Sequence, residues 1–194
     1  MLDTQNTQLP APRVPVVSEP LYVMERSWYR FFSNLYNYFV NLPFGSFYNT
    51  GTYSAAANTP TAVTFTTTAY SRHTFIGTPA SRITFDADGL TTITFSLQLT
   101  NSSASDDDVY VWLRKNGVDI PYTSSVVTVP KKHGSTNGAA LITVNFYQEF
   151  APGDYLELYW LTENGTSSIT TVPATTTPAK PASPGAVLTL SQII

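Results

Sequence analysis

Hydrophobic and polar residues alternate with a period of two over most of the chain from Ser46 onward. The stretch 90–100 shows this most clearly, because Ile93, Phe95 and Leu97 are separated by threonine and serine. Such alternation is typical of strands with one face on a core and the other on solvent. Turn-forming pairs such as Asn116-Gly117 separate the alternating segments. The pattern predicts strands over 47–56, 61–69, 73–76, 80–85, 90–100, 108–115, 124–129, 138–150, 154–162 and 185–193.

About ten strands at this spacing predict an all-β protein, a sandwich or barrel of antiparallel strands. The residues 170–184 interrupt the pattern with a low-complexity run that is rich in threonine and proline. Proline cannot donate to a central sheet ladder. We therefore expect 170–184 to be a long surface loop before the last strand.

One segment has a helical period instead. Apolar residues recur at steps of three or four at Leu21, Met24, Trp28, Phe31, Phe32, Leu35, Phe39 and Leu42. We predict a helix over 21–42, with Ser18 as N-cap and with Pro43 and Gly45 ending it. Seven of the twelve residues 28–39 are aromatic, more apolar surface than a solvated helix carries. This helix must pack on the domain, on sister helices or on another protein.

Residues 1–20 are polar and contain Pro10, Pro12, Pro15 and Pro20, which favours extended chain. Two interpretations stay open for them: a disordered tail, or an arm that becomes ordered on a partner. Together with the helix they predict an attachment segment over 1–45. The remaining residues, 46–194, are predicted to form a separate β-domain, the knob.

Composition excludes several classes of protein. Only 12% of the residues are charged, about half of the roughly 25% usual in soluble domains, and threonine is abundant. A net charge of −3 argues against nucleic-acid binding through phosphates. There is no cysteine, hence no disulfide or thiolate ligand. We also expect no spanning helix, no membrane attachment and no signal peptide, because 18-residue apolar runs and a basic, apolar leader are both missing.

Catalytic motifs are missing as well. The sequence has no Gly-x-Ser-x-Gly elbow, no metalloprotease motif and no phosphate-binding glycine loop. His73 and His133 have no acid and nucleophile beside them in sequence, and Glu149 with Asp154 is too common a pair to indicate a glycosidase. We expect a protein that is not an enzyme and that needs no cofactor.

Four segments occur in an order that resembles the globular-head jelly rolls of complement and tumour-necrosis-factor-like trimers. They are Asp88-Gly89-Leu90 with TTITFSLQL (91–99), VYVWLRKNG (109–117), FAPGDYLELYW (150–160) and PGAVLTLSQI (184–193). Three further segments are similar to structural proteins of tailed bacteriophages, especially those of cyanobacteria and marine bacteria. They are ERSWYRFFSNLYNYF (25–39), SFYNTGTYSAAANTPTAVTF (46–65) and SRITF (81–85).

The first resemblance implies a ten-stranded jelly roll that forms a homotrimer around a three-fold axis. Candidate residues for the trimer interface are Tyr110, Trp112, Tyr155, Tyr159 and Trp160. Both tryptophans are equally consistent with the core of one sandwich. Some members of that family hold calcium near the trimer apex, and Asp106-Asp107-Asp108 offers suitable carboxylates. A solvated loop tip is the simpler interpretation of these three residues, so we expect no metal.

The second resemblance implies a virion protein made in the host cytoplasm. The first hypothesis is a capsid decoration or cement protein on the outer surface of the shell, bound to the major capsid protein or another virion component. Its anchoring face would comprise Arg26, Trp28, Arg30, Phe31, Phe32, Leu35 and Phe39. The alternative is the receptor-binding head of a tail fibre or appendage. A cytokine-like ligand is a third hypothesis, which the missing export signal makes less favoured.

Overall fold

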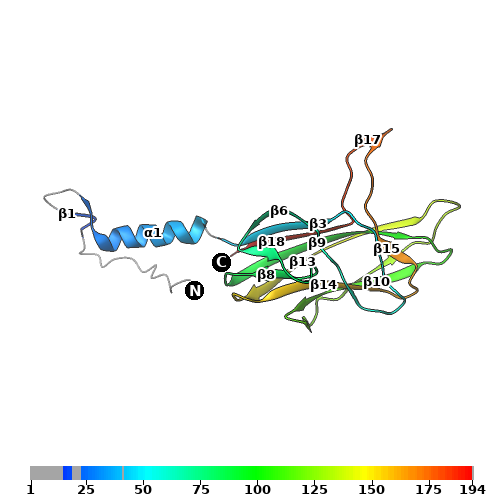
Figure 1. Ribbon diagram of the computed structural model, residues 1–194, viewed down its shortest axis with the longest axis horizontal. Helices are drawn as coiled ribbons and strands as arrows, with labels where there is room; N and C mark the ends of the chain where they lie inside the picture. The colour runs from blue at the N-terminus through cyan, green and yellow to red at the C-terminus, as the bar shows by residue number, and fades with distance from the viewer. Residues whose placement is uncertain (1–14, 19–22, 41, 194) are drawn as a thin grey trace. The chain divides into compact units, whose positions relative to one another are not determined.

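The computed structural model describes residues 15–18, 23–40 and 42–193 (Figure 1). The chain divides into two compact units, Met1–Leu42 and Pro43–Ile194. Within the described residues, no helix is long and apolar enough to cross a membrane.

The first unit contains a short strand pair followed by the helix. Strand β1 (Val17–Ser18) pairs antiparallel with β2 (Val23–Met24), and α1 spans Arg26–Val40. The Glu25 N–H donates to the Val16 carbonyl, and the first helical bond runs from the Tyr29 N–H to the Glu25 carbonyl. The helix therefore begins at Arg26 and not at position 21, because the residues before it are bonded to β1. The prediction of Ser18 as N-cap is wrong, since Ser18 belongs to β1.

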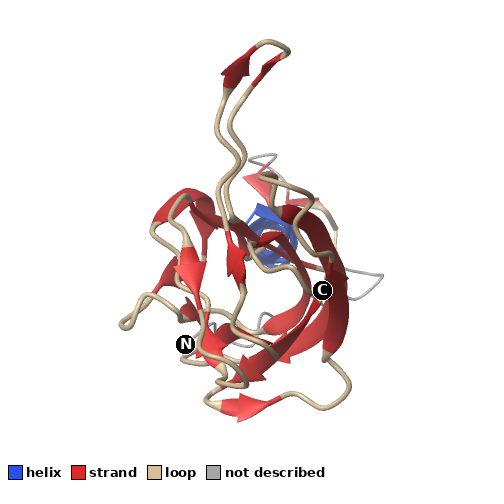
Figure 2. Ribbon diagram, turned by 90° about the vertical axis from the view of Figure 1, so that its right-hand side faces the viewer, coloured by secondary structure: helices blue, strands red, loops and turns tan. Residues whose placement is uncertain are grey.

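The second unit is a sandwich of two seven-stranded sheets whose strand pairs are all antiparallel (Figure 2). The first sheet has the order β4 (Tyr53–Ser54), β15 (Ser167–Ile169), β9 (Gly89–Asn101), β18 (Ala186–Gln192), β3 (Phe44–Asn49), β6 (Thr67–Arg72). Strands β15 and β18 pair with successive parts of β9, and β13 (Gly138–Phe150) pairs with β9 along its whole length. The second sheet has the order β11 (Val118–Asp119), β10 (Asp107–Lys115), β14 (Tyr155–Thr162), β8 (Ile83–Phe85), β7 (Thr74–Ile76), with β12 (Ser125–Val129) on β10 and β5 (Thr61–Ala62) on β14. This confirms the predicted all-β jelly-roll sandwich.

The core lies between the two sheets and is built from the inward members of each alternating strand. Residues Ile93, Phe95 and Leu97 of β9 are fully buried, while the threonines and serines between them are half-buried on the other face. Phe85 and Phe150 stack with their ring centroids 3.9 Å apart. Burial of such side chains supplies most of the stability of the sandwich.

Residues with positive φ angles shape two tight corners of the second unit. Asn116 and Gly117 join β10 to β11 with positive φ angles of 53° and 80°, the geometry of a type I′ turn. Gly153, with φ of 92°, lies in the corner between β13 and β14. The Asn116-Gly117 pair therefore marks a tight turn, as predicted, and Gly153 marks a second one.

The segment 170–184 differs from the predicted loop, because it contains a two-stranded hairpin. Strands β16 (Thr175–Thr176) and β17 (Ala179–Lys180) pair with each other, and a further bridge joins Val172 to Ser183. The hairpin projects away from the sandwich (Figures 1 and 2). Its short strands are exposed, so they add no buried surface to the core.

Candidate interaction surfaces

The first candidate surface is the aromatic face of α1. Trp28, Phe31 and Phe32 form a ring cluster with centroids 5.3–6.1 Å apart. Tyr29, Phe32, Tyr36 and Phe39 each leave 44–65% of their surface exposed. Trp28, Phe31 and Leu35 are half-buried, and Arg26 and Arg30 are exposed. The helix thus displays large apolar side chains that the described part of the chain leaves largely exposed.

The second candidate surface is the outward face of the sheet that contains β10 and β14. Trp112 lies opposite Tyr159 in the register, with ring centroids 5.9 Å apart. The Arg114 guanidinium lies 4.3 Å above the Tyr159 ring, and the Trp112 indole N–H donates to Asp119 at 2.7 Å. These half-buried aromatic side chains therefore already have partners within the chain.

Two further tyrosines extend this surface. The Arg82 guanidinium lies 4.2 Å from the Tyr155 ring centroid. The Tyr110 hydroxyl donates to Glu163 at 3.0 Å, and this hydrogen bond raises the pKa of Tyr110. Trp160, by contrast, points into the sandwich and is fully buried. Its side chain fills the core of one sandwich and is not available for the interface expected from the sequence.

The third candidate surface was missed in the sequence analysis and lies on the outward face of β13. Leu141 is 57% exposed and Tyr147 is 64% exposed, although both belong to a long, regular strand. Between them the face is polar: Thr143 donates to Ser96 across the strand pair. The alternation in 138–150 signals this face, because Leu141 and Tyr147 fall on the polar side of the pattern.

The three aspartates at the start of β10 have different environments. Asp107 is 1% exposed, while Asp106 is exposed and accepts the Lys131 N–H. Within the described residues no group of three or more His, Cys, Asp or Glu side chains is placed to hold a metal ion. Asp107 is a buried side chain, so the interpretation of all three as a solvated loop tip is wrong for it.

Asp107 organises the turn between β14 and β15. Its carboxylate accepts four hydrogen bonds, from the hydroxyls of Thr162 and Thr166 and from the backbone N–H groups of Asn164 and Ser167. Burial alone would raise the pKa of Asp107, but these hydrogen bonds outweigh burial and lower it to about 2. The carboxylate therefore holds the turn in its charged form.

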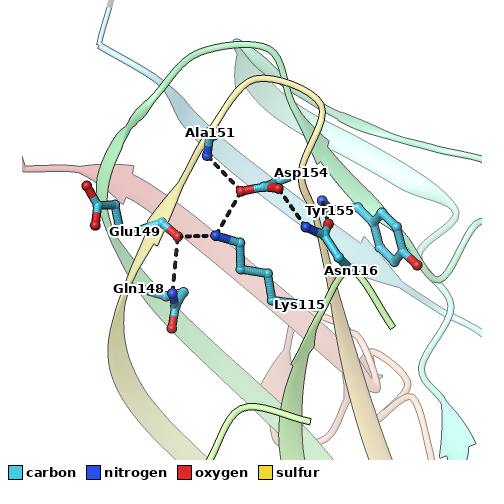
Figure 3. A network of polar contacts seen from close by, with 7 residues as sticks. All are labelled: Lys115, Asn116, Gln148, Glu149, Ala151, Asp154 and Tyr155. Atoms are coloured by element: carbon cyan, nitrogen blue, oxygen red, sulfur yellow. Dashed lines mark hydrogen bonds and ion pairs between the residues drawn. The ribbon is translucent and has the colours of Figure 1, made fainter. Parts of the chain in front are cut away.

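A second polar network holds the corner between β13 and β14 (Figure 3). Asp154 accepts from the Ala151 N–H at 2.8 Å, pairs with Lys115 at 2.8 Å and accepts from Asn116 at 2.6 Å. Burial would raise the pKa of Asp154, but the hydrogen bonds from Lys115, Asn116 and Ala151 and the charge of Lys115 lower it. The network joins this corner to the end of β10.

The residues considered for catalysis do not converge. The Glu149 side chain points away from Asp154, while its carbonyl accepts from Lys115 (Figure 3). His73, in the turn between β6 and β7, pairs at 2.7 Å with Asp86, which follows β8. His133 lies in an exposed turn and is bridged to Thr136. These residues therefore lie in separate strands and turns of the jelly roll.

Comparison with known proteins supports the architecture. No family model and no curated protein matches the sequence. The solved structure of Eiger TNF from S. frugiperda is similar, with a TM-score of 0.52 and 8% identity over 79% of this chain and 94% of that one. Murine APRIL at pH 5.0 has a TM-score of 0.50 and 10% identity, covering 78% of this chain and 99% of that one. The globular domain of the zebrafish complement 1qA protein has 11% identity and a TM-score of 0.44, covering 78% of this chain and 98% of that one. At these identities the likeness to the first two concerns the fold alone: the chain contains a jelly-roll β-sandwich of the kind found in TNF-like domains.

Proposed function

We propose that this chain is a trimeric structural protein of a tailed-bacteriophage virion that decorates and stabilises the outer surface of the capsid. One observation carries the proposal. A TNF-like jelly roll is joined to a separate N-terminal unit whose helix exposes several aromatic rings. The phage setting rests on the resemblance of 25–39, 46–65 and 81–85 to phage virion proteins in sequence alone. The protein acts by binding, without catalysis, cofactor or nucleic acid.

The N-terminal unit is the proposed attachment device for the major capsid protein or a neighbouring virion component. Burying one large aromatic side chain contributes about 1.5–3 kcal/mol. Three linked copies on a repeating lattice bind with a much higher effective affinity than one copy. A few exposed rings on each α1, flanked by Arg26 and Arg30, are therefore enough for stable decoration.

Two surfaces of the jelly roll are available for the trimer contact. The predicted aromatic residues Tyr110, Trp112, Tyr155 and Tyr159 are half-buried and have partners in the chain. Leu141 and Tyr147 are more exposed, so covering them removes more apolar surface from water. We therefore place the trimer contact on the outward face of β13, with the other surface as the second candidate.

The proposal is tested on purified particles by a double variant, Trp28→Ala with Phe32→Ala. We expect the variant jelly roll to stay folded but to be lost from particles, which then release DNA at lower temperature. The matched control is Ser27→Ala with Ser33→Ala on the polar side of the same helix, which should be incorporated normally. Normal incorporation of the aromatic variant would refute attachment that depends on these two rings.

The second candidate function is a receptor-binding head on a tail fibre, and the projecting hairpin β16–β17 favours it. An exposed hairpin that stands off a compact domain is suited to touching another surface (Figure 2). The two functions differ in copy number, measured by gel densitometry of the virion. Hundreds of copies per particle support decoration. A few dozen copies, with variant particles that hold DNA but do not adsorb to cells, would support the receptor-binding head.

A further inference from the structure

The apolar residues of α1 follow a heptad pattern. Trp28, Phe32, Leu35 and Phe39 are separated by four, three and four positions, which is the spacing of successive d, a, d and a positions. In a helix this spacing places the four side chains along one seam. We call these four residues the seam.

The rest of the helix agrees with this register. Tyr29 and Tyr36 fall at the e positions and Phe31 at a g position, beside the seam. The b, c and f positions from 26 to 37 are all polar: Arg26, Ser27, Arg30, Ser33, Asn34 and Asn37. An apolar stripe that includes the seam and its flanks is wider than the a and d stripe that a two-stranded coiled coil buries. This width favours three helices over two.

A second and a third copy of the same helix fit the seam as its occupants. Phe32 and Phe39 are exposed in the single chain, and a helix of 15 residues is marginally stable without packing. Both arginines of α1 lie at b and f positions, so identical parallel helices bring no like charges together at the seam. The seam is therefore compatible with self-association in both shape and charge.

The short link to the jelly roll also favours sister helices. Strand β3 begins at Phe44, four positions after α1 ends at Val40. In a trimer of the jelly roll, short links keep the three helices at roughly millimolar effective concentration and start them in the same register. Parallel pairing of identical a and d positions is then the arrangement with the lowest entropic cost.

From these features we infer that three copies of α1 pack in parallel along Trp28, Phe32, Leu35 and Phe39 to form a three-helix foot. The inference rests on the trimer proposed above and refines its attachment surface. The seam residues bury against sister helices. The arginines and the outer edges of Tyr29 and Tyr36 then remain on the outside of the foot, where they contact the virion.

Cysteine cross-linking tests the foot directly, because the chain contains no cysteine of its own. With helix axes about 10 Å apart and Cα atoms about 2.3 Å from each axis, seam Cα atoms of two sister helices lie about 6 Å apart. On the outside of the foot the separation is about 14 Å. A disulfide needs roughly 4.4–6.8 Å. Leu35→Cys in the full chain should therefore cross-link on oxidation, and the matched control Asn37→Cys, at an f position, should not.

We expect the full chain to be a trimer by light scattering. After oxidation, Leu35→Cys should give a disulfide-linked dimer plus a monomer on a denaturing gel, because each trimer holds three single cysteines. Phe32→Cys should do the same, which guards against a local folding defect in one variant. A trimer in which the seam variants cross-link no better than Asn37→Cys would overturn the foot and leave the trimer standing. Cross-linking in particles only to another virion protein would also overturn it. A monomer at every concentration would refute the trimer itself.

Discussion

The variant Asp107→Asn tests how much the buried carboxylate of Asp107 stabilises the fold. Asparagine keeps the shape of the side chain but replaces one acceptor oxygen with a donor amide. The four groups around Asp107 are all used as donors to it, and two of them are the fixed backbone N–H groups of Asn164 and Ser167. At least one donor thus loses its acceptor, and the others lose the assistance of the charge.

The pKa gives the magnitude. Lowering the pKa of Asp107 from 3.8 to about 2 means that the fold favours the charged carboxylate over its neutral form. At about 1.4 kcal/mol per pKa unit this preference is about 2–3 kcal/mol. With the mispaired donor added, we expect Asp107→Asn to lower the free energy of unfolding by about 2–4 kcal/mol. The corresponding fall in melting temperature is roughly 5–15 °C.

The assay is urea unfolding of both proteins between pH 7 and pH 2, followed by tryptophan fluorescence. A depressed carboxyl pKa stabilises the fold above the unfolded pKa and loses this effect as the pH falls through the folded one. The part of the difference that comes from the charge should be full at pH 6 and halved near pH 3. Asp108→Asn is the control and should change stability by less than about 0.5 kcal/mol. Equal effects of the two variants, or a difference that does not change with pH, would contradict the stabilising role of the charged carboxylate.

Two further predictions concern β13. In Gly138→Ala the new Cβ would lie 1.6 Å from the Pro130 carbonyl oxygen, so the backbone must move. We expect the free energy of unfolding, measured by chemical denaturation, to fall by about 2–3 kcal/mol, and wild-type stability would contradict this. The double variant Leu141→Asn with Tyr147→Asn should convert the trimer to monomers in light scattering, since it removes about 3–6 kcal/mol of apolar burial per protomer. Val126→Asn, beside Tyr110 on the second candidate surface, is the comparison, and a trimer that survives the double variant would place the contact elsewhere.

The strands and their turns could be predicted from local pattern, because alternation and turn chemistry act over a few residues. The alternation around Phe95 predicts β9, and Asn116-Gly117 predicts the tight hairpin that follows β10. Two predicted segments, 47–56 and 61–69, proved to contain two strands each. Local pattern does not show where a chain leaves one sheet partner for another.

The inward face of β14 could not be predicted in the same way. Both sets of alternate residues in this strand are largely apolar, with Tyr159 in one and Trp160 in the other. The register with β10 places Trp160 opposite Val111 in the core and Tyr159 opposite Trp112 outside. Pairing with a strand distant in sequence therefore decides which aromatic residues remain at the surface.

The start of α1 and the role of Asp107 likewise depended on tertiary contacts. Periodicity extends the helix back to position 21, but pairing of β2 with β1 takes up Val23 and Met24 first. Asp107 has an aspartate on either side, and nothing in the sequence distinguishes the three. Only the folded chain brings Asn164 and Ser167, more than fifty residues away, against one carboxylate, because hydrogen bonds depend on distance in space and not on distance along the chain.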